Sequence, residues 1–205
     1  QQDVNNNVYS NHFYANGGGF QVYITNTRIQ NNIVSNNLTK NTGIGVGGYA
    51  GPAGIMCESD TVPMIAIIRD NLVENNETRA YEAGYGAGMG TWLLANGSVI
   101  ENNRIINNKN DWNGGGLDIY SSSFTTLIIK NNYFIGNEAN NGGALDNEFD
   151  TTSQVLLINN IFNQNSASDQ GGAIWIKRNN VCPVEHMIIS INNTFYDNHA
   201  DSAGG

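Results

Sequence analysis

A short asparagine-rich motif recurs along the whole chain and restricts the folds that it can adopt. In the copy at residues 159–165, two Asn residues precede Ile161-Phe162, and Asn165 closes a turn. The spacing between copies varies from 21 residues (34 − 13) to 39 residues (73 − 34). Because a repeat sets the architecture of a solenoid protein, this motif is the first constraint on the fold. The apolar position after the Asn pair falls at Phe13, Val34, Val73, Ile105, Phe134, Phe162 and Phe195.

The irregular spacing favours stacked β-coils over helical repeats. A helical solenoid keeps a nearly fixed period, because its helices set the length of each unit. The shortest interval, 21 residues, is too short for a helix pair but fits one coil of short strands and tight turns. The variable spacers are then loops inserted at the corners of the coils.

Stacking of coils explains why Asn recurs. Equivalent residues of neighbouring coils lie about 4.8 Å apart, so identical Asn side chains can hydrogen-bond from coil to coil. Three rows qualify for such ladders: the first Asn of each pair, the second, and the Asn that closes the turn. The apolar row is expected to stack inside, and Gly-Gly bends fit corners that need small residues or positive φ. The second Asn of each pair falls at Asn11, Asn32, Asn71, Asn103, Asn132, Asn160 and Asn193.

The repeats resemble those of polymorphic outer-membrane proteins and of secreted β-helix proteins of the pectate-lyase-like superfamily. The resemblance rests on a GGA-plus-apolar motif, as in residues 171–174, and on an F-x-x-N motif, as in residues 195–198. It implies an all-β fold, a right-handed parallel β-helix solenoid of about seven coils with variable corner loops. We expect a single domain over residues 1–205 that is a segment of a longer chain. The same fold carries lyases, hydrolases, adhesins and structural proteins, so the resemblance leaves the function open.

The acidic composition, with few basic residues, limits the kinds of molecule that the protein is expected to bind. The formal net charge is −9, and Lys and Arg number only 9 among 205 residues. This argues against nucleic-acid binding, which needs clustered basic side chains. No apolar stretch of about 18 residues occurs, so we expect no membrane span. The acidic chain fits an extracellular or cell-surface protein and permits calcium as a cofactor.

One outward face of the predicted solenoid gathers the residues best suited to binding. Aromatic side chains beside carboxylates suit sugar rings, which present an apolar face and hydroxyl groups. The alternative is an ordinary solvated sheet face, since Tyr and Trp are common in strands. The first outward row reads Gln21, Ala50, Gly90, Asp118, Asp146 and Trp175, and the second reads Tyr23, Pro52, Trp92, Tyr120, Glu148 and Lys177. The candidates for glycan binding are Tyr23, Trp92, Tyr120 and Trp175.

The acidic end of this face supports two enzyme hypotheses. In a polysaccharide lyase, Asp118, Asp146 and Glu148 would hold calcium against a uronate. Lys177 or Arg178 would then abstract a proton. In a glycoside hydrolase, Asp146 and Glu148 would form the catalytic pair, because residues two apart on a strand lie about 6.5–7 Å apart, in the inverting range. Against both hypotheses, the chain has few basic residues with which to hold an acidic polymer.

Two cysteines are expected to remain free. The largest insertion is predicted at Gly51 to Pro63 and places Cys57 in a loop of the second coil, with Cys182 in a loop of the sixth. Four rungs would separate them by about 19 Å, whereas a disulfide needs Cα atoms within roughly 7 Å. We therefore expect free thiols, or partners outside this segment. A row of alternating charge, expected to be structural, comprises Gln30, Arg69, Glu101, Lys130, Ile158 and Ile191.

The favoured hypothesis is a secreted or cell-surface β-helix module with a structural or adhesive role and a lateral face that contacts glycans. Its partners would be polysaccharide or other surface proteins. Coils without a recognisable cap would also allow end-to-end self-association. The alternative is a polysaccharide lyase or glycoside hydrolase that acts on an acidic polysaccharide. A flat face between Asp118 and Lys177 would favour the first hypothesis, and a cleft would favour the second.

Overall fold

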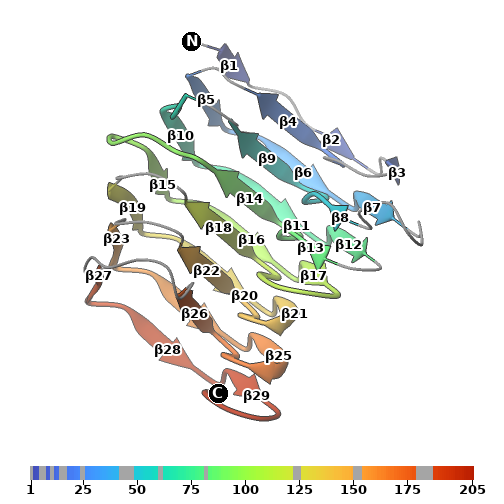
Figure 1. Ribbon diagram of the computed structural model, residues 1–205, viewed down its shortest axis with the longest axis vertical. Coiled ribbons are helices and arrows are strands. Elements are labelled where there is room, and N and C mark those ends of the chain that lie inside the picture. Colours follow the sequence, from blue (N-terminus) through green and yellow to red (C-terminus); the bar gives the residue numbers. More distant parts are fainter. Residues whose placement is uncertain are drawn as a thin grey trace.

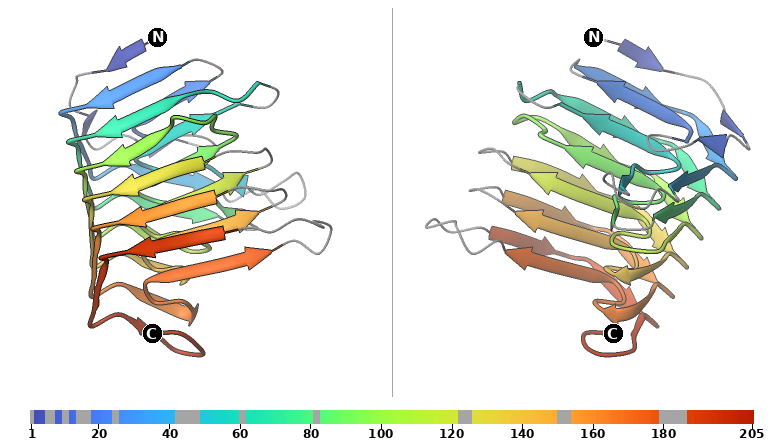
Figure 2. Two further views of the ribbon diagram at one scale, coloured as in Figure 1. Left: turned by 90° about the vertical axis from the view of Figure 1, so that its left-hand side faces the viewer. Right: turned by 45° about the vertical axis from the view of Figure 1, so that its right-hand side comes forward.

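The computed structural model of the protein is a parallel β-solenoid (Figures 1 and 2). It describes residues 2–4, 8–9, 12–13, 18–23, 26–41, 49–59, 62–80, 83–121, 126–149, 154–178 and 187–205. Within these residues all regular secondary structure is β-strand, and the paired strands run parallel. The expected all-β parallel β-helix is therefore confirmed.

Four sheets run along the solenoid, and each turn of the chain adds one strand to each sheet. Sheet A consists of β1 (Gln2–Val4), β5 (Thr27–Gln30), β10 (Ala66–Arg69), β15 (Val99–Glu101), β19 (Thr126–Lys130), β23 (Gln154–Ile158) and β27 (Met187–Ile191). Sheet B consists of β2 (Val8–Tyr9), β6 (Ile33–Ser35), β11 (Leu72–Glu74), β16 (Arg104–Ile106), β20 (Tyr133–Ile135), β24 (Ile161–Asn163) and β28 (Thr194–Tyr196).

The remaining two long sheets complete each turn. Sheet C consists of β3 (His12–Phe13), β7 (Leu38–Asn41), β12 (Glu77–Ala80), β17 (Lys109–Asn110), β21 (Glu138–Asn141), β25 (Ser166–Gln170) and β29 (His199–Ala200). Sheet D consists of β4 (Phe20–Tyr23), β9 (Ile55–Glu58), β14 (Met89–Trp92), β18 (Leu117–Ser121), β22 (Leu145–Phe149) and β26 (Ile174–Arg178). A small two-stranded sheet pairs β8 (Tyr49–Ala50) with β13 (Ala83–Gly84).

The described chain forms about five full coils rather than the seven expected. The coils from β5 to β26 each contribute a strand to all four sheets. The short strands β1 to β4 precede them, and β27 to β29 follow as a partial turn. Figure 1 shows this stack, with strands of successive coils side by side from the blue N-terminal end to the red C-terminal end. The repeat count is higher because it also includes the first turn, whose strands are short, and the partial last turn.

Two columns of Asn side chains, buried in all but the last coil, join successive coils at the corners on either side of sheet B. Asn71 Nδ2 donates to Asn103 Oδ1 and to the Ile29 carbonyl, each at 3.0 Å. The Asn71 backbone N–H donates to the same Oδ1 atom at 3.0 Å. Each Asn thus satisfies backbone groups that the corners would leave unpaired. The columns are Asn32, Asn71, Asn103, Asn132, Asn160, Asn193 and Asn37, Asn76, Asn108, Asn137, Asn165, Asn198.

The first Asn of each pair does not form the third ladder that the sequence led us to expect. It adopts the left-handed conformation, with φ of 57° at Asn31 and 56° at Asn102. Asn tolerates this region because its short polar side chain can hydrogen-bond locally. The first Asn therefore turns the chain, and the second joins the coils. The residue before the closing Asn is also left-handed, at Asn36, Asn75, Asn107, Gly136, Gln164 and Asp197.

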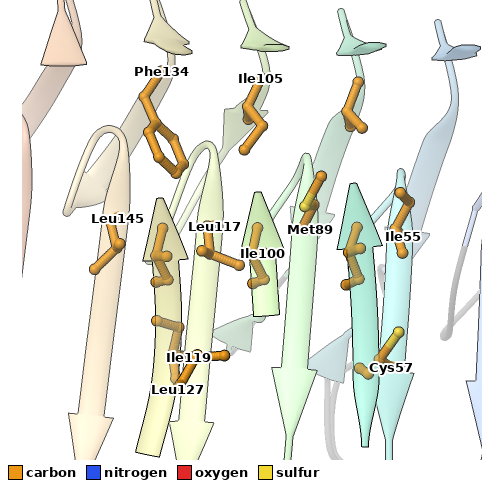
Figure 3. Close-up of a cluster of buried hydrophobic side chains, with 14 of the residues drawn as sticks. Ile55, Cys57, Met89, Ile100, Ile105, Leu117, Ile119, Leu127, Phe134 and Leu145 are labelled. Carbon is orange, nitrogen blue, oxygen red and sulfur yellow. The ribbon is translucent and has the colours of Figure 1, made fainter. Parts of the chain in front are cut away.

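Apolar rows from the sheets fill the interior of the solenoid. Figure 3 shows Ile105 of sheet B and Leu117 of sheet D in this buried cluster. Phe162 stacks between Phe134 and Phe195, with ring centroids 4.9 Å and 4.8 Å apart. The predicted core row is confirmed in register, and it comprises Val34, Val73, Ile105, Phe134, Phe162 and Phe195.

The first copy of the motif was misaligned. Val34 pairs with Val8, not with Phe13, and Phe13 instead pairs with Thr39 in sheet C. Val8 therefore holds the register position that was predicted for Phe13. His12 likewise belongs to sheet C, where it pairs with Leu38.

The second coil was also misaligned. Its sheet D strand is β9, so Met56 pairs with Gln21 and Glu58 pairs with Tyr23, in the places predicted for Ala50 and Pro52. The chain from Gly51 to Glu58 is therefore not an insertion but the bend and strand of the coil. Cys57 lies in that strand, fully buried, and its thiol is free as predicted. Cys182 lies outside the described residues.

The row of alternating charge on sheet A is confirmed in register. Lys130 Nζ lies 3.0 Å from Glu101 Oε2, and Arg69 Nη1 lies 3.9 Å from Glu101 Oε1. Arg69 Nε also donates to Gln30 Oε1 at 3.0 Å. Because the Lys and Arg side chains are well exposed, each ion pair stabilises the fold by only about 0.2–1 kcal/mol.

Candidate functional site

The outer face of sheet D brings the predicted acidic residues together from the fourth coil onward, beginning at β18. Asp118 pairs with Asp146 on the next strand. Two positions further along, Tyr120 pairs with Glu148, and Glu148 pairs with Lys177. Because side chains alternate between the two faces of a strand, all of them point away from the core.

Asp118 and Asp146 are nevertheless buried, with only 4% and 1% of each residue exposed. The corner segment that precedes each sheet D strand lies over them, and its residues Tyr85 and Asn113 form a parallel bridge. Gly114 follows with φ of 66°, and a Cβ atom there would lie 2.9 Å from the Asp118 Cβ. Glycine therefore allows the close approach that covers the two carboxyl groups.

A pocket of about 200 Å³ lies between this corner segment and sheet D. One side is formed by residues of sheet D and the other by the corner residues of the third and fourth coils. The face between Asp118 and Lys177 is therefore hollowed rather than flat. The pocket is lined by Gly84, Tyr85, Trp112, Asn113, Asp118, Tyr120, Asp146, Glu148 and Lys177.

Aromatic rings cluster at the pocket. The ring centroids of Trp92 and Tyr120 are 4.3 Å apart, and those of Trp92 and Tyr85 are 5.5 Å apart with an interplanar angle of 65°. Trp92 thus contacts two rings that line the pocket. Trp112 is held by its indole N–H, which donates to the Ala80 carbonyl at 3.3 Å. The aromatic side is therefore fixed by ring packing and by a hydrogen bond.

Burial makes Asp118 and Asp146 difficult to ionise. Burial, followed by repulsion from Asp146 and Glu148, raises the pKa of Asp118 well above its usual value, and a hydrogen bond from the Gly86 backbone N–H only partly opposes this. Burial and the charge of Glu148 likewise raise the pKa of Asp146 to about 8. The two carboxyl groups therefore stay protonated at neutral pH more than ordinary aspartates do.

Glu148 has a different environment from the buried pair. Lys177 Nζ lies 3.3 Å from Glu148 Oε1, and their side chains are 47% and 21% exposed. Lys177 Nζ also lies 5.8 Å from the centroid of the Trp175 ring. The Lys177–Glu148 ion pair therefore lies beside the buried carboxyl groups of Asp118 and Asp146, which favour their neutral form.

One oxygen of Asp146 has no hydrogen-bond donor among the residues that the structure describes. This atom, Oδ1, is buried. The carboxyl group does receive hydrogen bonds from the Asn147 backbone and the Asn113 side chain. Asn113 is itself oriented by Asn141, whose Nδ2 donates to Asn113 Oδ1 at 3.1 Å. Buried polar atoms are normally paired, so Oδ1 has capacity for a donor from a ligand.

The structure unites some of the predicted site residues and separates others. Trp92 and Tyr120 lie at the pocket. The predicted charged residues also line it: Asp118, Asp146, Glu148 and Lys177. Tyr23 is 49% exposed on β4, outside the pocket lining. Trp175 pairs with Asp146 but donates from its indole N–H to Gln170 Oε1 at 3.2 Å and does not line the pocket. The side chain of Arg178 lies outside the described part of the chain.

Sequence reasoning missed the corner side of the pocket. The sequence analysis assigned no role to Tyr85, Trp112 and Asn113, yet they form the wall opposite sheet D. A signal was present, because Tyr85 and Asn113 each directly precede a left-handed glycine, Gly86 or Gly114. Aligning the residue before each bend would have placed them in one column.

Two further observations concern the described residues. No group of three or more His, Cys, Asp or Glu side chains among them has an arrangement that would hold a metal ion. No helix in the described part of the chain is long and apolar enough to span a membrane.

The comparisons with known proteins do not assign the chain to a family. No protein-family model matches it, and no curated protein and no solved structure matches it either. The β-solenoid therefore rests on the structure itself, and the resemblance to the pectate-lyase-like superfamily gains no support beyond the fold.

Proposed function

We propose that this protein is a carbohydrate-binding β-solenoid module that takes one sugar unit of a glycan into the sheet D pocket. The observation that carries this proposal is that the buried carboxyl groups of Asp118 and Asp146 share one pocket with Tyr120, whose ring packs against Trp92. Carboxyl oxygens accept the hydrogen bonds that sugar hydroxyl groups donate. Aromatic rings supply an apolar surface at low conformational cost. An adhesive role at the cell surface is consistent with this function.

The size of the pocket supports binding of a single sugar unit. Its volume of about 200 Å³ is below the roughly 300–1,000 Å³ of pockets that enclose drug-sized ligands. The remaining units of the glycan would lie along the outer rows of sheet D, which run parallel to the solenoid axis. Trp175 and the exposed Tyr23 stand on these rows beyond the pocket.

Substitution of Tyr120 tests the proposal. We expect Tyr120→Ala to weaken binding of a responsive oligosaccharide roughly tenfold or more, since aromatic contacts dominate binding energy. Isothermal titration calorimetry with neutral, amino and uronate oligosaccharides would measure the change. Tyr133→Ala is the matched control, because Tyr133 is exposed on sheet B near Arg104 and away from the pocket. Equal loss in both variants, or no binding by the parent protein, would contradict the proposal.

A glycoside hydrolase is the second candidate, favoured by the hollowed face between Asp118 and Lys177 and by the contrast between Asp146 and Glu148. The pKa of Asp146, about 8, keeps it protonated at neutral pH, as a general acid requires. Glu148 lies two residues away on the same strand, about 6.5–7 Å distant, in the range for an inverting pair. A lyase has less support, because Lys177 is engaged by Glu148 at 3.3 Å rather than free to abstract a proton.

The same oligosaccharide panel separates a hydrolase from a binding module. Hydrolysis would release new reducing ends in proportion to enzyme and time, and Asp146→Asn would abolish their release. Binding without any new reducing ends would leave the module as the function. A polysaccharide lyase would instead produce an unsaturated product that absorbs in the ultraviolet.

A further inference from the structure

We infer that the sheet D pocket selects an amino sugar, whose ammonium group binds between the carboxyl groups of Asp118 and Asp146. This inference rests on the proposed carbohydrate binding and names the class of sugar. It differs from the sequence-based expectation of an acidic polysaccharide. Three features of the pocket support it: its excess of carboxyl groups over cationic groups, the unpaired oxygen of Asp146, and the rings beside the carboxyl pair.

The charge of the pocket disfavours an acidic ligand. Three carboxyl groups line it, from Asp118, Asp146 and Glu148, against the single ammonium group of Lys177. That ammonium group is already engaged, 3.3 Å from Glu148 Oε1. A uronate would bring a carboxylate beside Glu148 and would make the buried pair still harder to ionise, because like charges repel strongly where water is excluded. The whole chain, with a net charge of −9, also repels an anionic ligand at longer range.

The unpaired oxygen of Asp146 identifies what the pocket lacks. Asp146 is 1% exposed, and its Oδ1 atom has no donor among the described residues. An ammonium group carries three donors and no acceptor. It would therefore supply the missing hydrogen bond, and its positive charge would favour release of a proton from the carboxyl pair, so that an ion pair forms. A hydroxyl group would supply the hydrogen bond alone. Buried charges are tolerated when they are both paired and hydrogen-bonded.

The surrounding groups are suited to a cation as well as to a sugar ring. The pocket lining includes Tyr85, Tyr120 and Trp112. Aromatic faces attract an ammonium group through the ring quadrupole, by about 0.5–2 kcal/mol. The aromatic residues would therefore favour the charged nitrogen and also provide the apolar surface that any sugar needs.

Matched oligosaccharides test the selection directly. Each pair differs only in an amino or hydroxyl group at one carbon, in both the gluco and galacto series, with N-acetylated and uronate versions alongside. We expect the amino form to bind the parent protein at least tenfold more tightly than the hydroxyl form, by calorimetry at neutral pH. We expect the uronate form to bind most weakly.

Two variants with the same change of charge test whether the preference for the amino form arises in the pocket. Asp146→Asn should abolish the preference for the amino form, so that the amino and hydroxyl forms bind this variant with equal affinity. Glu138→Gln, which also removes one negative charge, should keep the preference, because Glu138 pairs with Lys109 outside the pocket. Circular dichroism of each variant would verify that the fold is retained.

The outcomes separate the two proposals. Equal affinity for amino and hydroxyl forms would overturn the selection while leaving carbohydrate binding in place. A preference that Glu138→Gln removes as much as Asp146→Asn would also overturn it, because general charge attraction would then suffice. Calcium binding that is lost in Asp146→Asn and blocks the amino sugar would reassign the carboxyl pair to a metal. Absence of binding to every oligosaccharide would remove carbohydrate binding itself.

Discussion

Asn102 and Asn103 are neighbours with the same side chain, yet they have different structural roles at one corner. Asn102 takes a φ of 56° and turns the chain, while Asn103 is fully buried within a ladder. Asn103 Oδ1 accepts from the Asn71 backbone and side chain, and its Nδ2 donates to Asn132 Oδ1 and the Ile68 carbonyl. The repeated Asn pair predicted ladders but did not predict that only the second Asn joins a ladder while the first turns the chain. Residue type alone does not reveal the sign of φ.

Replacing Asn103 by Ala should destabilise the protein by about 3 kcal/mol or more, because several buried polar groups lose their partners at roughly 1–3 kcal/mol each. Chemical denaturation would measure the loss in the free energy of unfolding. Asn102→Gly is the control, and it should change that free energy by less than about 1 kcal/mol, since Gly adopts positive φ readily. Similar losses in both variants would mean that the ladder contributes no more than the turn.

The buried acids make stability depend on pH. The pKa of Asp146 rises from 3.8 to about 8 on folding, so between these values the folded state binds more protons than the unfolded state. The free energy of unfolding should therefore fall as pH rises through this window, and Asp118 should act in the same direction. Thermal melts at several pH values should show a smaller decline for Asp146→Asn than for the parent protein. A parallel decline in the two proteins would show that Asp146 titrates normally.

At the scale of elements, the short strands of sheet B illustrate how stacking creates a core. Each strand contributes one central apolar residue, and the stack of Phe134, Phe162 and Phe195 forms only when three coils are in register. Alternation and the flanking Asn residues predicted this row correctly from the second coil onward. The predicted position of the sheet D strand in the second coil was wrong because glycines occur both at 43–48 and at Gly51 and Gly54. Two alternative bends therefore fit the pattern. Only pairing across coils, such as Met56 with Gly90, distinguishes them.

Phe162→Ala should destabilise the protein by about 3–5 kcal/mol, because it empties a fully buried site between two stacked rings. Phe195→Ala is the matched comparison and should cost less, since Phe195 is 50% exposed. Urea denaturation of both variants would measure the difference. A larger loss in Phe195→Ala would contradict this account of the stack.

At the scale of the whole molecule, the repeat predicted the architecture, whereas the pocket depended on contacts between corners that the repeat did not reveal. Asp118 and Asp146 were correctly placed on the outer face of sheet D. Strand alternation equates an outward position with a solvated one, and here the corner segment with Tyr85 and Asn113 overrides that rule. Both the burial of the acids and their raised pKa values therefore followed only from the folded chain.

The ladders also give the solenoid a polarity. In each column, the Nδ2 atom of one coil donates to the Oδ1 atom of the following coil, from Asn71 to Asn103 and onward to Asn132. Every link runs in the same sense, and such aligned amides polarise one another. A further coil can extend the columns beyond Asn193 and Asn198 only by presenting acceptors to their donors, and an inverted coil would set donor against donor. Coils can therefore be added to this stack in one orientation only, because one face of every coil presents amide donors and the other presents amide acceptors.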